Sequence, residues 1–154
     1  MKAVNCCSKH SLRVFGPAGA RARNESQTRY LMLRILLVDD EDSFRKMMCQ
    51  TLTEMGYEVM EACNGRDAVQ IHELCPADIV LTDLIMPDTD GIETIRELKR
   101  IHSSVKIIAM SGGGWVGTRD YLKAAKLIGA DETLTKPFSK QDMAAALERL
   151  SGKQ

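Results

Sequence analysis

The sequence lacks the long apolar runs and the paired cysteine spacings that would place the protein in a membrane or in an oxidising compartment. No segment of its 154 residues approaches the roughly 18 uninterrupted apolar residues that a membrane span requires. The five cysteines show no C-x-x-C spacing, which disfavours a disulfide framework or a zinc site. We therefore expect a soluble cytoplasmic protein with no membrane partner.

Acidic residues are scarce at the start of the chain. The formal net charge of zero is therefore the sum of a basic first segment and an acidic remainder. Residues 1–31 hold six Lys/Arg and one acid, Glu25, so the other 15 basic and 20 acidic residues give the rest of the chain a net charge of −5. A mildly acidic body disfavours binding to nucleic acid, and no helix-turn-helix unit follows it. We therefore expect no specific nucleic acid binding.

The chain divides into a short irregular segment and one domain. Residues 1–31 mix Ser, Gly, Arg and Asn without helical or alternating apolar periodicity, which is typical of a disordered tail. Met32 immediately precedes the first apolar run, so this segment could instead be an extension ahead of the true start. We predict a disordered basic tail or such an extension at 1–31, and one domain of ordinary size at 32–151.

From residue 33 onward, short β-rich runs alternate with amphipathic segments. This alternation predicts a parallel sheet with helices on both faces, an α/β fold. The strands are expected at 33–38, 57–60, 79–82, 105–110 and 133–135, and the helices around 44–55, 66–74, 92–98, 118–128 and 140–150. Right-handed crossovers favour the flavodoxin-like, doubly wound strand order 2-1-3-4-5 for such a set of five strands and five helices.

Several residues are assigned to packing rather than to chemistry. The first helix carries one apolar stripe, which is predicted to face the sheet and comprises Phe44, Met47, Met48, Thr51, Leu52 and Met55. Gly56 is expected to end this helix in the left-handed conformation. Cys49 and Cys63 are interpreted as small core residues, and His72 and His102 as surface or partly buried side chains.

Acidic residues end two of the predicted strands. Asp39 and Asp40 follow the first strand, and Asp83 follows the third. The first and third strands are neighbours in the predicted order, and ligands of an open parallel sheet gather at the carboxyl ends of the strands. Three adjacent carboxylates repel one another unless a cation lies between them, and hard oxygen ligands suit Mg²⁺. The sequence therefore predicts a magnesium site.

The fourth and fifth strands end in a hydroxyl and an ammonium group, those of Ser111 and Lys136. A carboxylate can attack a phosphoryl group when a metal offsets its charge and nearby donors steady the transferring oxygens. We therefore assign catalytic roles to Asp83, Ser111 and Lys136. The plainer alternatives are that Asp39 and Asp40 cap the next helix and that Lys136 is a solvated lysine, but five strand-end residues that fit one chemistry favour a site.

The same strand ends carry extended motifs, at Val38–Glu41, Thr82–Gly91, Ala109–Gly112 and Thr135–Phe138. With these motifs the sequence from residue 33 to about 150 resembles the response-regulator receiver domain, in the stand-alone form of the chemotaxis regulators. The resemblance implies that Asp83 is the phosphoacceptor and that Asp40, Asp83 and the Ile85 carbonyl ligate Mg²⁺. It also implies that Asp39 acts through a bound water and that a cis peptide follows Lys136.

Two features depart from the pattern of the receiver family. Thr133 stands three positions before the site lysine, where many receivers carry an aromatic switch residue. Any conformational relay must therefore run through the glycine-rich loop after the fourth strand or through the fourth helix. Ile85 and Gly113, two positions after the acceptor and after the site serine, offer no side chain that could orient an attacking water, which predicts slow self-dephosphorylation.

These observations predict a single-domain response regulator that accepts a phosphoryl group on Asp83 from a histidine kinase or a histidine phosphotransfer protein. We expect it to require Mg²⁺, to catalyse only its own phosphorylation and dephosphorylation, and to signal by binding an unidentified downstream protein. Pairing of two copies through the fourth and fifth helices stays open. The alternatives are a phosphorylation-independent binding module and an aspartate-nucleophile phosphohydrolase, although the latter needs a second acid where Ile85 stands.

Overall fold

Strands and helices alternate throughout the part of the chain that the structure describes, which is residues 32–87, 90–112 and 118–151 of a computed structural model. The strands are β1 (Arg34–Val38), β2 (Glu58–Ala62), β3 (Ile79–Asp83), β4 (Lys106–Gly112) and β5 (Glu132–Lys136). The helices are α2 (Asp42–Glu54), α3 (Gly65–Leu74), α4 (Gly91–Ile101), α5 (Thr118–Ile128) and α6 (Lys140–Ser151). The predicted tail and most of the predicted glycine-rich loop lie outside the described residues.

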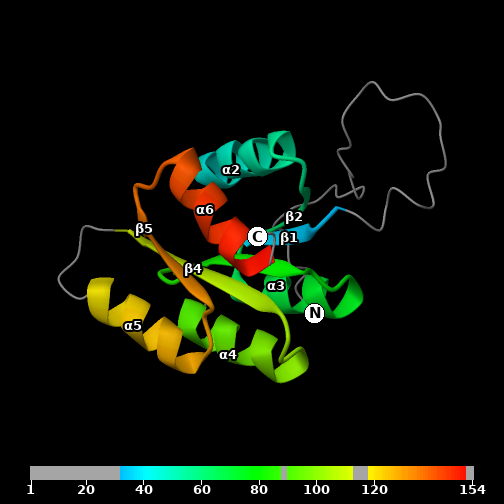
Figure 1. The fold of residues 1–154 in the computed structure, drawn as a ribbon. Helices are drawn as coiled ribbons and strands as arrows, with labels where there is room; N and C mark the ends of the chain where they lie inside the picture. Colours follow the sequence, from blue (N-terminus) through cyan, green and yellow to red (C-terminus); the bar gives the residue numbers. More distant parts are fainter. Residues whose placement is uncertain (1–31, 88–89, 113–117, 152–154) are drawn as a thin grey trace.

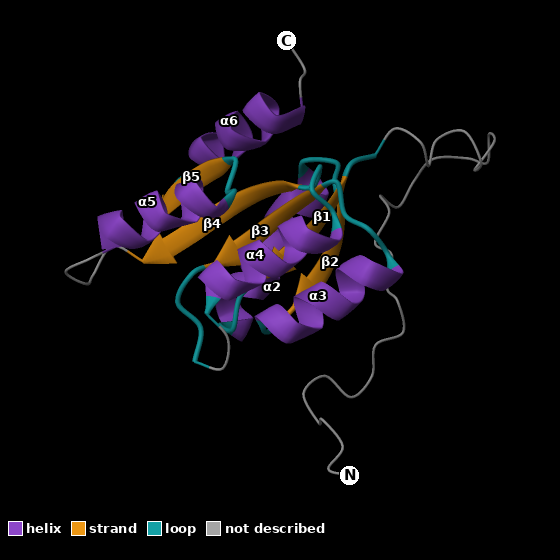
Figure 2. Cartoon of the chain, turned by 90° about the horizontal axis from the view of Figure 1, so that it is seen from below, coloured by secondary structure: helices purple, strands orange, loops and turns teal. Residues whose placement is uncertain are grey.

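The five strands form one parallel sheet in the order β2-β1-β3-β4-β5, as Figure 2 shows. Helices α2 and α6 cover one face of this sheet, and α3, α4 and α5 cover the other (Figure 1). The predicted α/β fold, with its flavodoxin-like order and five helices, is thereby confirmed. Because the chain winds in opposite directions from β1 and β3, the carboxyl ends of these two strands flank the crevice where such folds bind ligands.

The central strands are buried on both faces, and their alternate residues enter two separate cores. Leu36 and Val38 pack with the helices α3 to α5, whereas Ile35 and Leu37 pack with α2 and α6. A strand enclosed on both sides has no polar face, so its sequence is a continuous apolar run. None of the helices among the described residues is long and apolar enough to span a membrane.

The prediction for the first helix is correct to within two residues in its bounds, 44–55 against Asp42–Glu54, and partly wrong in the face that it buries. Gly56 has a φ of +91°, so the predicted left-handed stop is confirmed. Met47, however, is 54% exposed, and the buried arc of α2 runs through Arg45, Met48 and Leu52. Helix α2 is therefore rotated about its axis relative to the prediction. The Arg45 side chain occupies part of the buried face where Met47 was expected.

Two packing assignments also need correction. His72 is completely buried, whereas the sequence indicated a surface or partly buried side chain. Its Nδ1 accepts a hydrogen bond from the Ala77 N–H at 3.2 Å, and its ring lies edge-to-face against His102. Cys49 and Cys63 are only half-buried rather than buried in the core, although Cys49 packs against the core cluster beneath α2 and α6.

Candidate functional site

The three strand-end aspartates converge as the strand order requires. Carboxylate oxygens of Asp39, Asp40 and Asp83 all lie within 4.8 Å of one another. Asp39 is 1% exposed and Asp83 is 7% exposed, whereas Asp40 faces solvent. The cluster therefore has a buried floor of two carboxylates and one open side, and its hard oxygen atoms match the ligands that Mg²⁺ prefers.

The Lys136 ammonium lies between the two buried carboxylates. Its Nζ is 2.6 Å from Asp39 Oδ2 and 2.5 Å from Asp83 Oδ2, which links the end of β5 to the ends of β1 and β3. Burial alone would lower the pKa of Lys136, but the hydrogen bonds to the two carboxylates outweigh it and raise that pKa. Burial raises the pKa of Asp39, and the bond to Lys136 only partly opposes this shift. The Lys136–Pro137 peptide is cis, as the family resemblance implies.

Local backbone hydrogen bonds fix the other oxygen of each buried carboxylate. Asp83 Oδ1 accepts from the Ile85 N–H at 2.9 Å, and Asp39 Oδ1 accepts from the Glu41 N–H at 2.9 Å. In both cases an aspartate bonds to the backbone two residues further on, which holds the turn that follows the strand. Helix α2 begins after Glu41, so neither Asp39 nor Asp40 is the cap that the alternative interpretation suggested.

The Ser111 hydroxyl is fully buried and has no hydrogen-bond partner among the described residues. The strand register places Met110 opposite Asp83 and Ser111 opposite Thr135, so this hydroxyl lies at the same edge of the sheet as the aspartates and Lys136. A buried hydroxyl without a partner costs about 1–3 kcal/mol. Such a donor fits a site that is completed by an anionic group.

The loop between β3 and α4 packs tightly against the acceptor strand. A Cβ added at Gly91 would lie 2.3 Å from the Asp83 carbonyl oxygen and 2.5 Å from the Leu84 Cα. Asp90 caps α4 by accepting from the Ile92 N–H at 2.9 Å, so its carboxylate serves the helix rather than the acidic cluster. Glycine at 91 thus allows α4 to start directly against the backbone of Asp83.

Sequence reasoning missed two residues that contact the site. The buried Arg45 donates from Nη1 to the Asp39 carbonyl at 2.7 Å and pairs with Glu61 at 3.4 Å, so it ties α2 and β2 to the backbone of the acidic pair. Phe44, assigned to core packing, places its ring against the Lys136 ammonium. The available signal was a cationic residue beside the apolar stripe of α2, but the stripe alone does not show how the helix is rotated.

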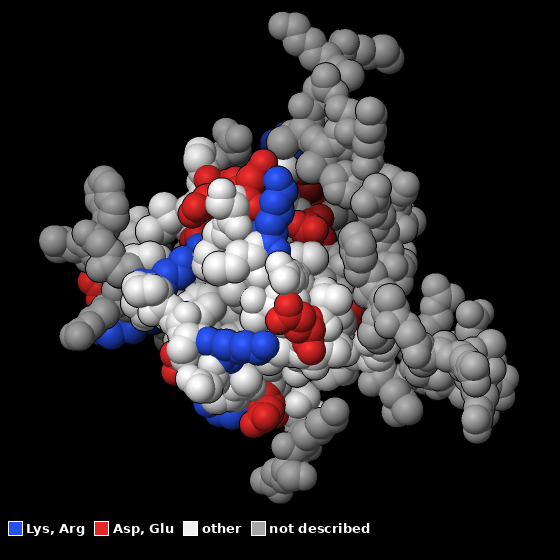
Figure 3. Space-filling view, turned by 90° about the horizontal axis from the view of Figure 1, so that it is seen from above, with Lys and Arg blue, Asp and Glu red and all other residues white. Residues whose placement is uncertain are grey.

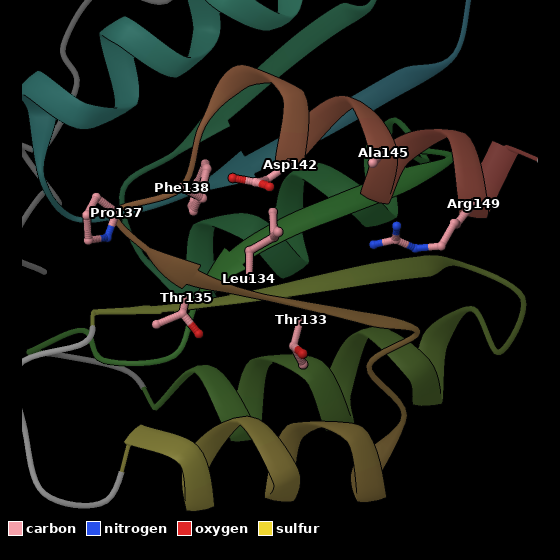
Figure 4. A pocket seen from close by; sticks show the side chains of 8 residues that line it. All are labelled: Thr133, Leu134, Thr135, Pro137, Phe138, Asp142, Ala145 and Arg149. Atoms are coloured by element: carbon pink, nitrogen blue, oxygen red, sulfur yellow. The ribbon is translucent and has the colours of Figure 1, made fainter.

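A shallow cavity of about 220 Å³ lies apart from this cluster, between β5 and α6 (Figure 4). Its lining comprises Thr133, Leu134, Thr135, Pro137, Phe138, Asp142, Ala145 and Arg149. None of the strand-end site residues contributes to it, so the cavity is separate from the acidic cluster. The face over α2 and α6 mixes basic and acidic side chains among its described residues (Figure 3), so charge alone marks no partner surface there.

Comparisons with known proteins show which family the chain resembles. The sequence profile of the response regulator receiver domain matches residues 35–148. Chemotaxis protein CheY of Thermotoga maritima is 37% identical over 119 residues, which covers 77% of this chain and 97% of that protein. The transcriptional regulatory protein PdtaR of Mycobacterium tuberculosis is 38% identical over 118 residues, but this chain spans only 55% of its length.

A solved structure extends the likeness to three dimensions. The crystal structure of a response regulator receiver domain protein from Clostridium thermocellum gives a TM-score of 0.73 at 29% identity and covers 79% of this chain and 96% of that chain. The profile match, the relatives and the fold all agree. The chain therefore belongs to the response regulator receiver domain family.

Proposed function

We propose that this receiver domain accepts a phosphoryl group on Asp83 from the phosphohistidine of a histidine kinase or a histidine phosphotransfer protein. Receiver domains are signalling modules of two-component systems and not classical enzymes. The observation that carries the proposal is the Lys136 ammonium, which lies within 2.6 Å of both Asp39 and Asp83 at one edge of the sheet. The output is a change in binding to a downstream protein, and the proposed location is the cytoplasm.

The transfer is a displacement at phosphorus. One carboxylate oxygen of Asp83 forms a P–O bond while the P–N bond to the donor imidazole breaks, and the electron pair of that bond stays on the ring nitrogen. A phosphoimidazole whose other ring nitrogen carries a proton thus leaves as neutral imidazole, and Asp83 becomes an acyl phosphate. The Ile85 N–H holds Asp83 Oδ1, so Oδ2, which faces Lys136, is the oxygen placed to attack.

Two cationic or polar side chains would then steady the phosphoryl oxygens. The Lys136 ammonium already lies beside Asp83 Oδ2, and the buried Ser111 hydroxyl has a donor available at the same edge. Both groups reach the phosphoryl group from strands other than the acceptor strand. Their donation strengthens as negative charge gathers on the transferring oxygens, because charge-assisted hydrogen bonds are shorter and stronger than neutral ones.

The acidic cluster fits Mg²⁺, with Asp40, Asp83 and the Ile85 carbonyl as proposed direct ligands and Asp39 acting through water. When bound, the ion would offset the negative charge of the carboxylates and of the incoming phosphoryl group. The exposure of Asp40 leaves this side of the site open to solvent, so a phosphohistidine on another protein could approach from there.

Intact mass spectrometry tests this proposal with acetyl phosphate as donor and Mg²⁺ present. The wild type should gain one phosphoryl group, and the isosteric variant Asp83→Asn should gain none; removal of Mg²⁺ with EDTA should also abolish the gain. Asp90→Asn is a matched control, because Asp90 is exposed and asparagine caps a helix as well as aspartate does. Equal labelling of Asp83→Asn and the wild type would contradict the proposal.

A further inference from the structure

The Lys136 ammonium contacts an aromatic face as well as two carboxylates. Its Nζ lies 4.0 Å from the centroid of the Phe44 ring, well inside the roughly 6 Å over which a ring quadrupole attracts a cation. Phe44 belongs to the first turn of α2, which starts just after the acidic pair. The ring and the carboxylates therefore hold the same ammonium, and they come from different elements of the fold.

A second ring restrains the first. Phe138 follows Lys136 by two residues and meets Phe44 edge-to-face, with centroids 6.1 Å apart and ring planes at 85°. Both rings are partly buried and pack against the apolar core beneath α2 and α6. The orientation of Phe44 is thus fixed by the core and by its neighbour, independently of what occupies the acidic cluster.

We propose that Phe44 is a positioning residue, whose ring face holds the Lys136 ammonium toward the phosphoryl group that reaches Asp83. This inference rests on the phosphoryl transfer proposed above. An ammonium group has three N–H donors, of which Asp39 and Asp83 each take one. The face of the Phe44 ring attracts the positive charge of the ammonium without a carboxylate-type hydrogen bond. Lys136 can therefore exchange its bond to Asp83 for one to a phosphoryl oxygen while its contact with the ring persists.

The rate of phosphorylation by acetyl phosphate with Mg²⁺ tests this role. Phe44→Leu keeps an apolar side chain but removes the ring, and we expect it to lower the second-order rate constant about two- to thirty-fold. Phe44→Tyr keeps the π face and should restore most of the rate. Met47→Leu is the control on the same helix, since Met47 is exposed, and should leave the rate unchanged. If Phe44→Leu does not fold, as judged by circular dichroism, Phe44→Met replaces it.

Nuclear magnetic resonance reports the contact without any phosphoryl transfer. Ring currents should shift the Lys136 Cε protons upfield in the wild type and in Phe44→Tyr, and this shift should vanish in Phe44→Leu. A wild type that is phosphorylated no faster than Phe44→Leu, or that shows no upfield shift, would overturn the role of Phe44 alone. A wild type that shows the shift but accepts no phosphoryl group would overturn the proposed function and this inference with it.

Discussion

Replacing Gly91 with alanine sets two physical effects against each other. Alanine has the higher helix propensity, so at the first residue of α4 this substitution should stabilise the protein by at most about 1 kcal/mol. The added Cβ, however, would lie 2.3 Å from the Asp83 carbonyl oxygen and 2.5 Å from the Leu84 Cα. Both contacts are with backbone, so no side chain can rotate away, and either the start of α4 or the end of β3 must move.

The steric clash of the added Cβ should cost more free energy than the higher helix propensity of alanine gains. Overpacking of this kind costs about 1–3 kcal/mol, occasionally more, which leaves a net destabilisation of about 1–2 kcal/mol. For a domain of about 120 residues, that loss lowers Tm by roughly 4–8 °C. Because the displaced backbone is that of the acceptor residue, we also expect slower phosphorylation by acetyl phosphate than in the wild type.

Urea denaturation followed by circular dichroism measures the first effect, and the denaturation midpoint should fall at an unchanged m value. Gly112→Ala is the matched control at a neighbouring strand end, because a Cβ there meets nothing within 4 Å among the described residues. That variant should be as stable as the wild type or slightly more stable. Equal stability of Gly91→Ala and Gly112→Ala, together with phosphorylation of Gly91→Ala at the wild-type rate, would refute the predicted clash.

Ile85, Asp131 and His72 can each be tested by a single substitution. Ile85→Asn, which adds an amide beside the acceptor, should speed decay of the radiolabelled phosphoprotein roughly two- to ten-fold, and an unchanged decay would contradict the role given to this position. Burial alone would raise the pKa of Asp131, but the Ile107 N–H and the Lys99 ammonium hold it below 3.8. Asp131→Asn should therefore cost about 2 kcal/mol in urea unfolding above that pH, and the cost should shrink as the pH falls through the lowered pKa. Burial lowers the pKa of His72 below its ordinary 6.5, so the stability of the wild type should decline as the pH drops below that value. His72→Asn should flatten this decline, and parallel curves would exclude His72 as its source.

The fold can be predicted from the sequence wherever the burial of an element leaves a direct pattern of apolar residues in its own segment. Strands β1 and β3 are enclosed on both faces, so their apolar runs identify them directly. Strand β2 was expected at 57–60 but runs from Glu58 to Ala62, because its end is set by pairing with β1, where Val38 lies opposite Ala62. A pairing between chain segments that are far apart in sequence leaves no local signal at the strand boundary.

The acidic cluster and the neighbouring Lys136 could also be predicted, because strand order alone brings the ends of β1, β3 and β5 to one edge. The contacts of Arg45 and Phe44 could not, since they depend on how α2 is rotated about its axis. An apolar stripe defines the buried face of a helix only to within about one residue on either side. The exposed Met47 and the buried Arg45 are two results of the same small rotation.

The most direct test of the account is to identify the residue that carries the phosphoryl group. Borohydride reduction converts an aspartyl phosphate to homoserine, and tandem mass spectrometry of the digested protein locates that homoserine in the sequence. After reaction with acetyl phosphate and Mg²⁺, we predict homoserine at position 83 and unchanged aspartate at positions 39 and 40. Homoserine at 39 or 40, or none in a protein that has gained a phosphoryl group, would contradict the assignment of Asp83 as the acceptor.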